Sequence, residues 1–236
     1  MLGVIINALG VVIGGTVGAV FGGAIKEKYT GAIITVMGLV MMMIGIQSTL
    51  GTNNILICIV CLVIGTLIGA ALDLDRKMNG AADKVKAMLS GTRLGRGRFA
   101  EAFVTTTILF CVGSMVVIGS ITAGLNHDYS ILITKTIMDF VSAIAFAAAL
   151  GPGVLMTAVS VLVIEGGLVL LAGVAQPILT TEVVTEMTAV GGVVLFGLSF
   201  NIMGFFEKKI QVGDMIPSLL LPVIYFPLKA LIENIL

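Results

Sequence analysis

Charged and aromatic residues are scarce in this sequence. Only 11% of the 236 residues are charged, tryptophan is absent, and His127 is the single histidine. A soluble domain carries about 25% charged residues, so a chain with this few would not stay dispersed in water. One histidine excludes a multi-histidine metal site and a histidine-activated nucleophile. Basic and acidic residues balance at 13 each, so the net charge gives no indication of nucleic-acid binding.

Sequence motifs of soluble enzymes are missing as well. The chain contains neither the G-x-x-x-x-G-K-[ST] phosphate loop nor the G-x-G-x-x-G dinucleotide motif. Its three cysteines, Cys58, Cys61 and Cys111, lie in apolar segments and are expected to be core residues rather than metal ligands. An intramembrane protease would need two aspartates sharing a proton, and Asp139 with Glu165 does not supply that pair. We therefore expect neither an enzyme nor a bound cofactor or metal.

Long apolar segments make up most of the chain. Hydrophobic residues account for 58% of the sequence, and the mean hydropathy is +1.17. A helix needs about 20 apolar residues to cross a bilayer, and eight segments approach or exceed that length. They are 3–23, 30–50, 55–72, 101–120, 131–150, 153–173, 184–205 and 214–234. The sequence predicts an all-α, polytopic membrane helix bundle with eight transmembrane helices, a single domain over 1–236 that contacts the lipid bilayer.

The positions of Lys and Arg predict the orientation of this bundle. Cytoplasmic loops carry an excess of these residues, and here they cluster at 26–28, 73–100 and 208–209. Eight spans place all three clusters on one face, whereas seven spans would put 208–209 outside. The loops of the opposite face contain no Lys or Arg; they are 51–54, 121–130 and 174–183. Both termini are therefore expected on the extracytoplasmic side.

The polar stretch 73–100 divides the chain into groups of three, two and three spans. Apolar residues from Leu74 to Leu89 recur at helical spacing among basic ones, which predicts an amphipathic helix on the cytoplasmic leaflet. The glycine-rich basic run 91–98 suits anionic lipid headgroups. An ordinary cytoplasmic loop is the favoured interpretation. Recognition of a lipid, a nucleotide or a cytoplasmic partner is the alternative, and it would make the protein a membrane scaffold or sensor.

The three-two-three division suggests an internal repeat. Residues 3–11 align without a gap with residues 153–161. A second set of matches pairs Val36, Gly38, Val40 and Gln47 with Val190, Gly192, Val194 and Asn201. The sixth span runs in the opposite direction to the first, so a repeat of spans 1–3 in spans 6–8 is inverted. That design is typical of secondary transporters.

Glycines form a regular stripe on the first span. Gly10, Gly14, Gly18 and Gly22 recur at every fourth residue and so share one helix face. Helices in lipid associate through such small residues because their backbones can then approach closely. Packing within one subunit is the favoured interpretation of this stripe. A homodimer through another face remains open.

Four ionisable residues are predicted to share one layer inside the membrane. Asp139 and Glu165 each lie eight residues from the outer end of a span, or about 12 Å deep. Lys135 stands one turn above Asp139 on the same helix, and Lys229 falls at a similar level. Charged residues at this depth mark ion or substrate pathways. Structural salt bridges, with Lys135 extending towards the surface, are the equal alternative.

Irregular backbone near this layer favours a binding role. Candidate helix breaks are Gly151, Pro152, Gly166, Gly167, Pro222 and Pro227. Broken helices at bilayer depth line cavities, and their free carbonyls can bind a cation. The polar residues Asn7, Gln47 and Asn201 are candidate gate groups or, as favoured, donors of interhelical hydrogen bonds. The sequence thus predicts a secondary transporter or ion-conducting protein, coupled to Na⁺ or H⁺, for a small solute or ion of unknown identity.

The N-terminal segment carries a resemblance to a known family. Residues 1–15, together with Leu72-Asp73-Leu74-Asp75, resemble the YqgA family of bacterial inner-membrane proteins, and the resemblance covers the whole chain. That family is a domain of unknown function whose members have been loosely described as sodium channels or pumps. The resemblance implies a multi-pass protein of the bacterial cytoplasmic membrane and supports ion transport. It supplies no established binding or catalytic residue.

Overall fold

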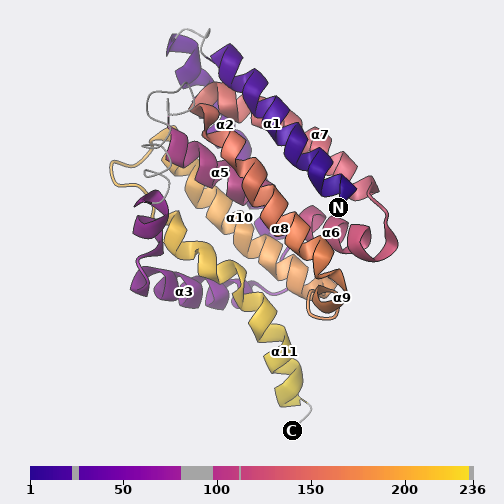
Figure 1. Ribbon diagram of the computed structural model, residues 1–236. Coiled ribbons are helices and arrows are strands. Elements are labelled where there is room, and N and C mark those ends of the chain that lie inside the picture. The colour runs from indigo at the N-terminus through magenta and orange to yellow at the C-terminus, as the bar shows by residue number, and fades with distance from the viewer. Residues whose placement is uncertain (23–26, 81–97, 112, 234–236) are drawn as a thin grey trace.

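The computed structural model describes residues 1–22, 27–80, 98–111 and 113–233, and all regular secondary structure in these ranges is helical (Figure 1). The α-helices are α1 (Leu2–Gly22), α2 (Glu27–Leu50), α3 (Ile55–Ala71), α5 (Phe99–Cys111), α6 (Ser114–Asn126), α7 (Ser130–Leu150), α8 (Thr157–Leu170), α9 (Ala172–Ala175), α10 (Thr181–Met203) and α11 (Leu221–Glu233). Two 3₁₀ helices, η2 (Pro152–Met156) and η3 (Val212–Leu219), precede α8 and α11. The predicted all-α class is confirmed.

Six segments of the described chain are long and apolar enough to cross a membrane. They correspond to the predicted spans 3–23, 30–50, 131–150, 153–173, 184–205 and 214–234. Two bent helix pairs raise the number to eight when each pair is counted as one span. Large apolar side chains remain exposed along α1 and α3, as contact with lipid requires. The protein is thus a polytopic helical membrane bundle.

The predicted span 101–120 is not one continuous helix. The chain forms α5 and α6 there, and the two helices are bent by 59° relative to each other. Gly113 stands before α6 with no side chain to pack, and α6 continues to Asn126. A second 59° bend separates α3 from a short helix at 74–80. The rest of the predicted amphipathic helix and the run 91–97 lie outside the described residues.

The predicted helix breaks have mixed outcomes. Gly151 has φ 101°, which favours glycine, and with Pro152 it separates α7 from η2 as expected. Gly166 and Gly167 do not break α8, because the backbone hydrogen bonds continue through them. Pro222 lies in the first turn of α11, where a missing N–H is tolerated, and Pro227 lies within this uninterrupted helix.

Glycines allow α1 to lie along α7 in near-backbone contact (Figure 1). A Cβ atom on Gly14 would stand 2.5 Å from the carbonyl oxygen of Phe140, and one on Gly22 would stand 2.7 Å from that of Ala148. A Cβ on Gly18 would collide with the carbonyl oxygen of Ile144. The glycine stripe therefore packs within the subunit, as favoured.

Counterpart elements of the two predicted repeats touch each other. Span 1 meets span 6 as α1 against α8, span 2 meets span 7 as α2 against α10, and span 3 meets span 8 as α3 against η3. The second contact is reciprocal: a Cβ on Gly45 would lie 2.7 Å from the Gly192 carbonyl oxygen, and one on Gly192 would lie 2.6 Å from that of Gly45. A two-fold axis between the halves produces contacts of this kind, and the repeat itself stays a prediction.

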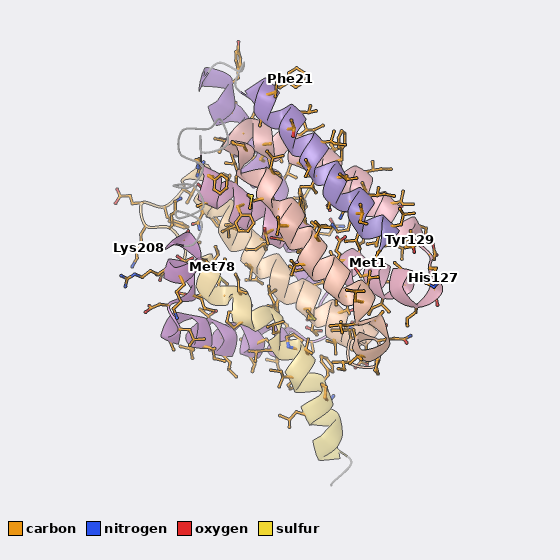
Figure 2. The ribbon with its side chains drawn as sticks, in the orientation of Figure 1. Met1, Phe21, Met78, His127, Tyr129 and Lys208 are labelled. Atoms are coloured by element: carbon orange, nitrogen blue, oxygen red, sulfur yellow. The ribbon has the colours of Figure 1, made fainter. Side chains whose placement is uncertain are left out.

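Arg98 and two hydroxyl pairs hold α5 in place. The Arg98 N–H donates to the Leu150 carbonyl at the end of α7, and its guanidinium donates to the Ile202 carbonyl at the end of α10. Hydroxyl pairs join α5 to α8; they are Thr106 with Thr157 and Thr107 with Ser160. Figure 2 shows Met1, His127 and Tyr129 at one end of the molecule, away from Phe21, Met78 and Lys208.

The glycine contact between α1 and α7 predicts opposite effects of alanine at two positions. Gly18→Ala places a methyl group against the Ile144 carbonyl and is expected to destabilise the protein by about 1–3 kcal/mol. Gly31→Ala in α2 meets nothing within 4 Å and should leave the melting temperature unchanged or raise it, because alanine favours helix. Melting curves in detergent compare the two variants. Equal melting temperatures would contradict the packing.

Candidate functional site

Four polar side chains from three helices meet inside the bundle. Asn7 comes from α1, Lys135 and Asp139 from α7, and Glu165 from α8, and all four are buried. Lys135 and Asp139 lie four residues apart and so share one face of α7. Asn7 lies on the α1 face that carries Gly3, Gly14 and Gly18, and this face packs against α7. We call these four residues the charged cluster.

The ammonium group of Lys135 contacts both carboxylates of the charged cluster. Its Nζ pairs with Asp139 Oδ2 and lies 3.2 Å from Glu165 Oε1. The side-chain amide of Asn7 also bridges the two acids, because Nδ2 donates to Asp139 Oδ2 at 3.1 Å and to Glu165 Oε1 at 2.9 Å. Glu165 is fully shielded, with 0% of its surface exposed. The sequence prediction that Asp139, Glu165 and Lys135 share a layer is therefore confirmed in geometry.

The charges in the charged cluster do not balance when every group is ionised. Two carboxylates face one ammonium, and Asn7 is neutral, so the sum is −1. Among the described ion pairs, Lys135 is the cation that these carboxylates contact. A buried charge without compensation is costly, and a proton or a bound cation on the carboxylates would remove this cost.

One buried oxygen of the charged cluster accepts no hydrogen bond from the described residues. Asn7 Oδ1 is buried and has no hydrogen-bond partner among the described residues. Buried polar atoms are almost always paired, so each exception requires a reason. Amide and carboxylate oxygens are the ligands that hard cations prefer. Asn7 Oδ1 and the carboxylate oxygens of Asp139 and Glu165 are oxygens of this type.

The remaining predicted site residues lie elsewhere. Lys229 is exposed on α11, which packs against α10, α3 and η3, so its predicted place in the polar layer is wrong: matching depth does not bring helices together. Gln47 is exposed on α2. Asn201 is buried and exchanges two 2.8 Å hydrogen bonds with the backbone of Ile210, which anchors the loop after α10.

A second buried glutamate was missed by the sequence interpretation. Glu186 in α10 is 1% exposed and accepts hydrogen bonds from the Thr52 hydroxyl at 2.6 Å and from the backbone N–H groups of Asn53 and Asn54 at 2.8 and 3.1 Å. It therefore anchors the loop between α2 and α3. The signal was present, because Glu186 is an ionisable residue inside the predicted span 184–205.

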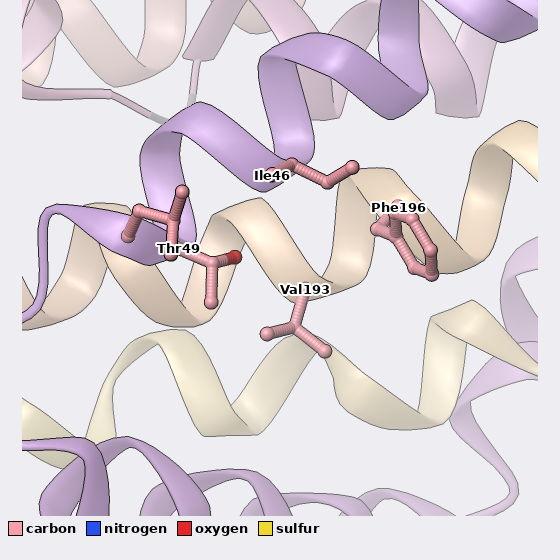
Figure 3. Close-up of a pocket in the computed structure, with 5 residues that line it drawn as sticks. Ile46, Thr49, Val193 and Phe196 are labelled. Carbon is pink, nitrogen blue, oxygen red and sulfur yellow. The ribbon is translucent and has the colours of Figure 1, made fainter.

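A shallow hollow of about 210 Å³ lies between α2 and α10 (Figure 3). Its walls are Ile46, Thr49, Leu50, Val193 and Phe196. The one polar group among them, the Thr49 hydroxyl, donates to the Gly45 carbonyl at 2.8 Å. The hollow thus offers an apolar surface without a charged group.

Taken together, the helices and the charged cluster define a polytopic membrane protein with an ionisable site inside the bundle. The chain belongs to the family described as "Protein of unknown function (DUF554)", which matches residues 2–227. The resemblance to the YqgA family is thereby confirmed.

Two curated relatives match nearly end to end. The chain is 29% identical over 235 residues to "Uncharacterized membrane protein YdfK" of Bacillus subtilis (strain 168), which covers 98% of both chains. It is 30% identical over 232 residues to "Uncharacterized protein YqgA" of Escherichia coli (strain K12), which covers 98% of this chain and 97% of the relative. No solved structure matches the chain.

The geometry predicts that Lys135 is required for stability. Lys135→Met leaves two buried carboxylates facing each other and should cost about 3–5 kcal/mol of unfolding free energy. Adding Asp139→Asn to Lys135→Met should recover part of this loss, because one negative charge is removed. Lys209→Met is the matched control, since this lysine side chain is 64% exposed and its pair with Glu101 is long at 3.4 Å.

Chemical denaturation in detergent measures all four proteins. The assignment fails if the double variant is less stable than Lys135→Met, or if Lys209→Met costs as much as Lys135→Met.

Proposed function

We propose that this protein is a cation-coupled secondary transporter or ion-conducting protein of the bacterial cytoplasmic membrane, and that Na⁺ or H⁺ binds at the charged cluster. The observation that carries the proposal is the charge of −1 on two buried carboxylates that share one lysine. Placing one uncompensated carboxylate at this depth costs roughly 2.5–3.5 kcal/mol on insertion scales. Binding one monovalent cation or one proton cancels this charge.

The two ions would use the same residues differently. A proton would sit on Asp139 or Glu165 and leave the other carboxylate paired with Lys135. A sodium ion would take carboxylate oxygens of both acids and the unpartnered Asn7 Oδ1. Lys135 would in either case neutralise one carboxylate and fix the positions of both. A dependence on Na⁺ at constant pH distinguishes the two ions.

The helix geometry supports movement of an ion rather than static binding. The backbone is irregular at Gly151 between α7 and η2, and α5 and α6 are sharply bent. Elements that correspond in the two predicted repeats also contact each other in pairs. Secondary transporters combine broken helices with inverted repeats around a midplane site. The alternative of a scaffold or sensor rests on the loop 73–100, of which residues 81–97 lie outside the described chain.

The orientation proposed from the basic loops places both termini outside the cytoplasm. Lys208 and the helix at 74–80 lie away from the end that carries Met1 and His127 (Figure 2). The basic loops lie on the cytoplasmic side in this proposal, which agrees with the charge rule for membrane proteins. The charged cluster then lies nearer to the extracytoplasmic end of α1 and α7.

Glu165→Gln is expected to abolish cation-dependent stabilisation. In wild-type protein, Na⁺ at about 100 times its dissociation constant should add about 2.7 kcal/mol of stability, seen as a higher melting temperature than in choline chloride. Glu165→Gln keeps the shape and balances the charges of Asp139 and Lys135, so the protein should stay folded and lose the shift. If H⁺ is the ion, the corresponding loss appears in a pH series without Na⁺.

Glu186→Gln is the matched control for this measurement. It changes an equally buried glutamate that binds a loop rather than the charged cluster, so the protein should lose stability and keep its response to the ion. Flux in proteoliposomes, driven by a Na⁺ or pH gradient, provides the functional readout. A folded wild-type protein with neither cation-dependent stability nor cation flux would overturn the proposed function.

A further inference from the structure

A small apolar cluster lies beside the charged cluster. It consists of Val4 from α1, Ala123 from α6, Leu132 from α7 and Val169 from α8, and Tyr129 packs against it. Val4 and Leu132 are 0% exposed, so the cluster is closed to solvent. We call these residues Val4, Ala123, Leu132 and Val169 the apolar plug. Each of the three helices that build the charged cluster contributes one residue to it.

The apolar plug lies one helical turn from the charged cluster on every helix. Val4 precedes Asn7 by three residues, Leu132 precedes Lys135 by three, and Val169 follows Glu165 by four. At 1.5 Å per residue these steps correspond to about 5 Å. All of them point to the same end of the bundle, since α1 and α7 begin there and α8 ends there. The plug is therefore a layer directly above the charges.

Beyond the apolar plug lies the exposed end of the molecule. Met1 is 41% exposed, His127 is exposed, and Figure 2 shows both near Tyr129. Towards the other end of the bundle, the charged cluster is covered by the main hydrophobic core. Val11, Ala143 and Val161 stand one turn below the charged cluster, all at 0% exposure, and belong to the largest core cluster of the described residues. On the exposed side, the apolar plug is the layer between the charged cluster and the exposed end of the bundle.

The helix α6 differs from the other walls of the plug in its polar contacts. It is 13 residues long and bends away from α5 after Cys111. No described hydrogen bond ties its side chains to another helix, and Ser120 Oγ is buried without a partner. It meets its neighbours through glycines: Gly119 faces Leu132, and Gly124 faces the Val169 carbonyl. These are van der Waals contacts, so α6 can separate from its neighbours without breaking a described hydrogen bond between side chains.

We propose that the apolar plug is the extracytoplasmic gate of the charged cluster and that it opens when α6 moves away from α7 and α8. The inference rests on the proposed function, because a gate needs an ion to admit. In the closed state the plug separates Lys135 and the two carboxylates from the exposed end of the bundle. When α6 moves, the unpaired Ser120 hydroxyl and the charged groups become the polar lining of the entry path.

Cys111 is a native reporter for this gate. It is 8% exposed at the end of α5 and lies in the same core cluster as its neighbour Phe110, whose ring centroid is 5.9 Å from Lys135 Nζ. Cys58 and Cys61 lie on α3 and are replaced by alanine, which leaves one thiol. A membrane-impermeant, positively charged methanethiosulfonate is added from the extracytoplasmic side to the full-length protein in proteoliposomes of known orientation.

Leu132→Ala is expected to raise the rate of Cys111 modification at least about tenfold, which corresponds to about 1.4 kcal/mol in the cost of opening. Leu150→Ala is the matched control, since Leu150 is an equally buried leucine at the other end of α7. Val169→Ala should change the rate in the same direction if Leu132→Ala folds poorly. Equal rates for Leu132→Ala, Val169→Ala and Leu150→Ala, in proteins with native melting curves, would overturn the gate.

A second pair of variants tests the movement of α6. A Cβ on Gly124 would lie 2.5 Å from the Val169 carbonyl oxygen, so Gly124→Ala should push α6 outward and accelerate modification of Cys111. Gly173→Ala meets nothing within 4 Å and should have no effect. Faster modification with neither cation-dependent stability nor cation flux would show that the plug opens through α6 and reject the proposed function. Cation-dependent stability with unchanged modification in all plug and α6 variants would reject the gate alone.

Discussion

The attachment of two carboxylates to one ammonium group is the interaction on which the rest of the structure depends. Lys135 binds Asp139 on its own helix and Glu165 on α8, and the Asn7 amide joins both acids to α1. These ion pairs and hydrogen bonds therefore hold three helices together in a membrane, where water cannot replace them. The same contacts leave a negative charge unmatched. In the proposed function, stability and ion binding are thus two consequences of a single arrangement.

The close approach of α1 to α7 makes this arrangement possible. Asn7 reaches the acids because Gly14 and Gly18, on the same face, let α1 lie against the carbonyl groups of α7. On the far side, Arg98 fixes the beginning of α5 to the ends of α7 and α10 through backbone carbonyls. Among the described residues, α6 has no side-chain hydrogen bond of this kind to another helix. The proposed gate uses this difference between a hydrogen-bonded charged cluster and the α6 wall.

Hydropathy along the sequence predicted the membrane-spanning segments. The energetic cost of burying a charge in the membrane predicted part of the site. Apolar length located six spans, and the rarity of buried charge identified Lys135, Asp139 and Glu165. Depth along a helix does not determine its neighbours, so Lys229 was misplaced. The bend between α5 and α6 was missed because hydropathy is continuous across Gly113. Glu186 was overlooked although it lies inside a predicted span; its hydrogen bonds to the backbone of Asn53 and Asn54, far away in the sequence, could not be predicted.

The central claim is that the charged cluster cannot hold two ionised carboxylates and one lysine without a proton or a cation. Infrared difference spectroscopy of the purified protein measures this directly, because protonated carboxyl groups absorb separately from carboxylates. We expect a band from a buried, protonated carboxyl group near neutral pH in the absence of Na⁺. This band should disappear when Na⁺ binds or, if the protein is proton-coupled, when the pH rises. It should be missing in the double variant Asp139→Asn/Glu165→Gln. A spectrum in which every buried carboxyl stays ionised, unchanged by Na⁺ or pH, would contradict it.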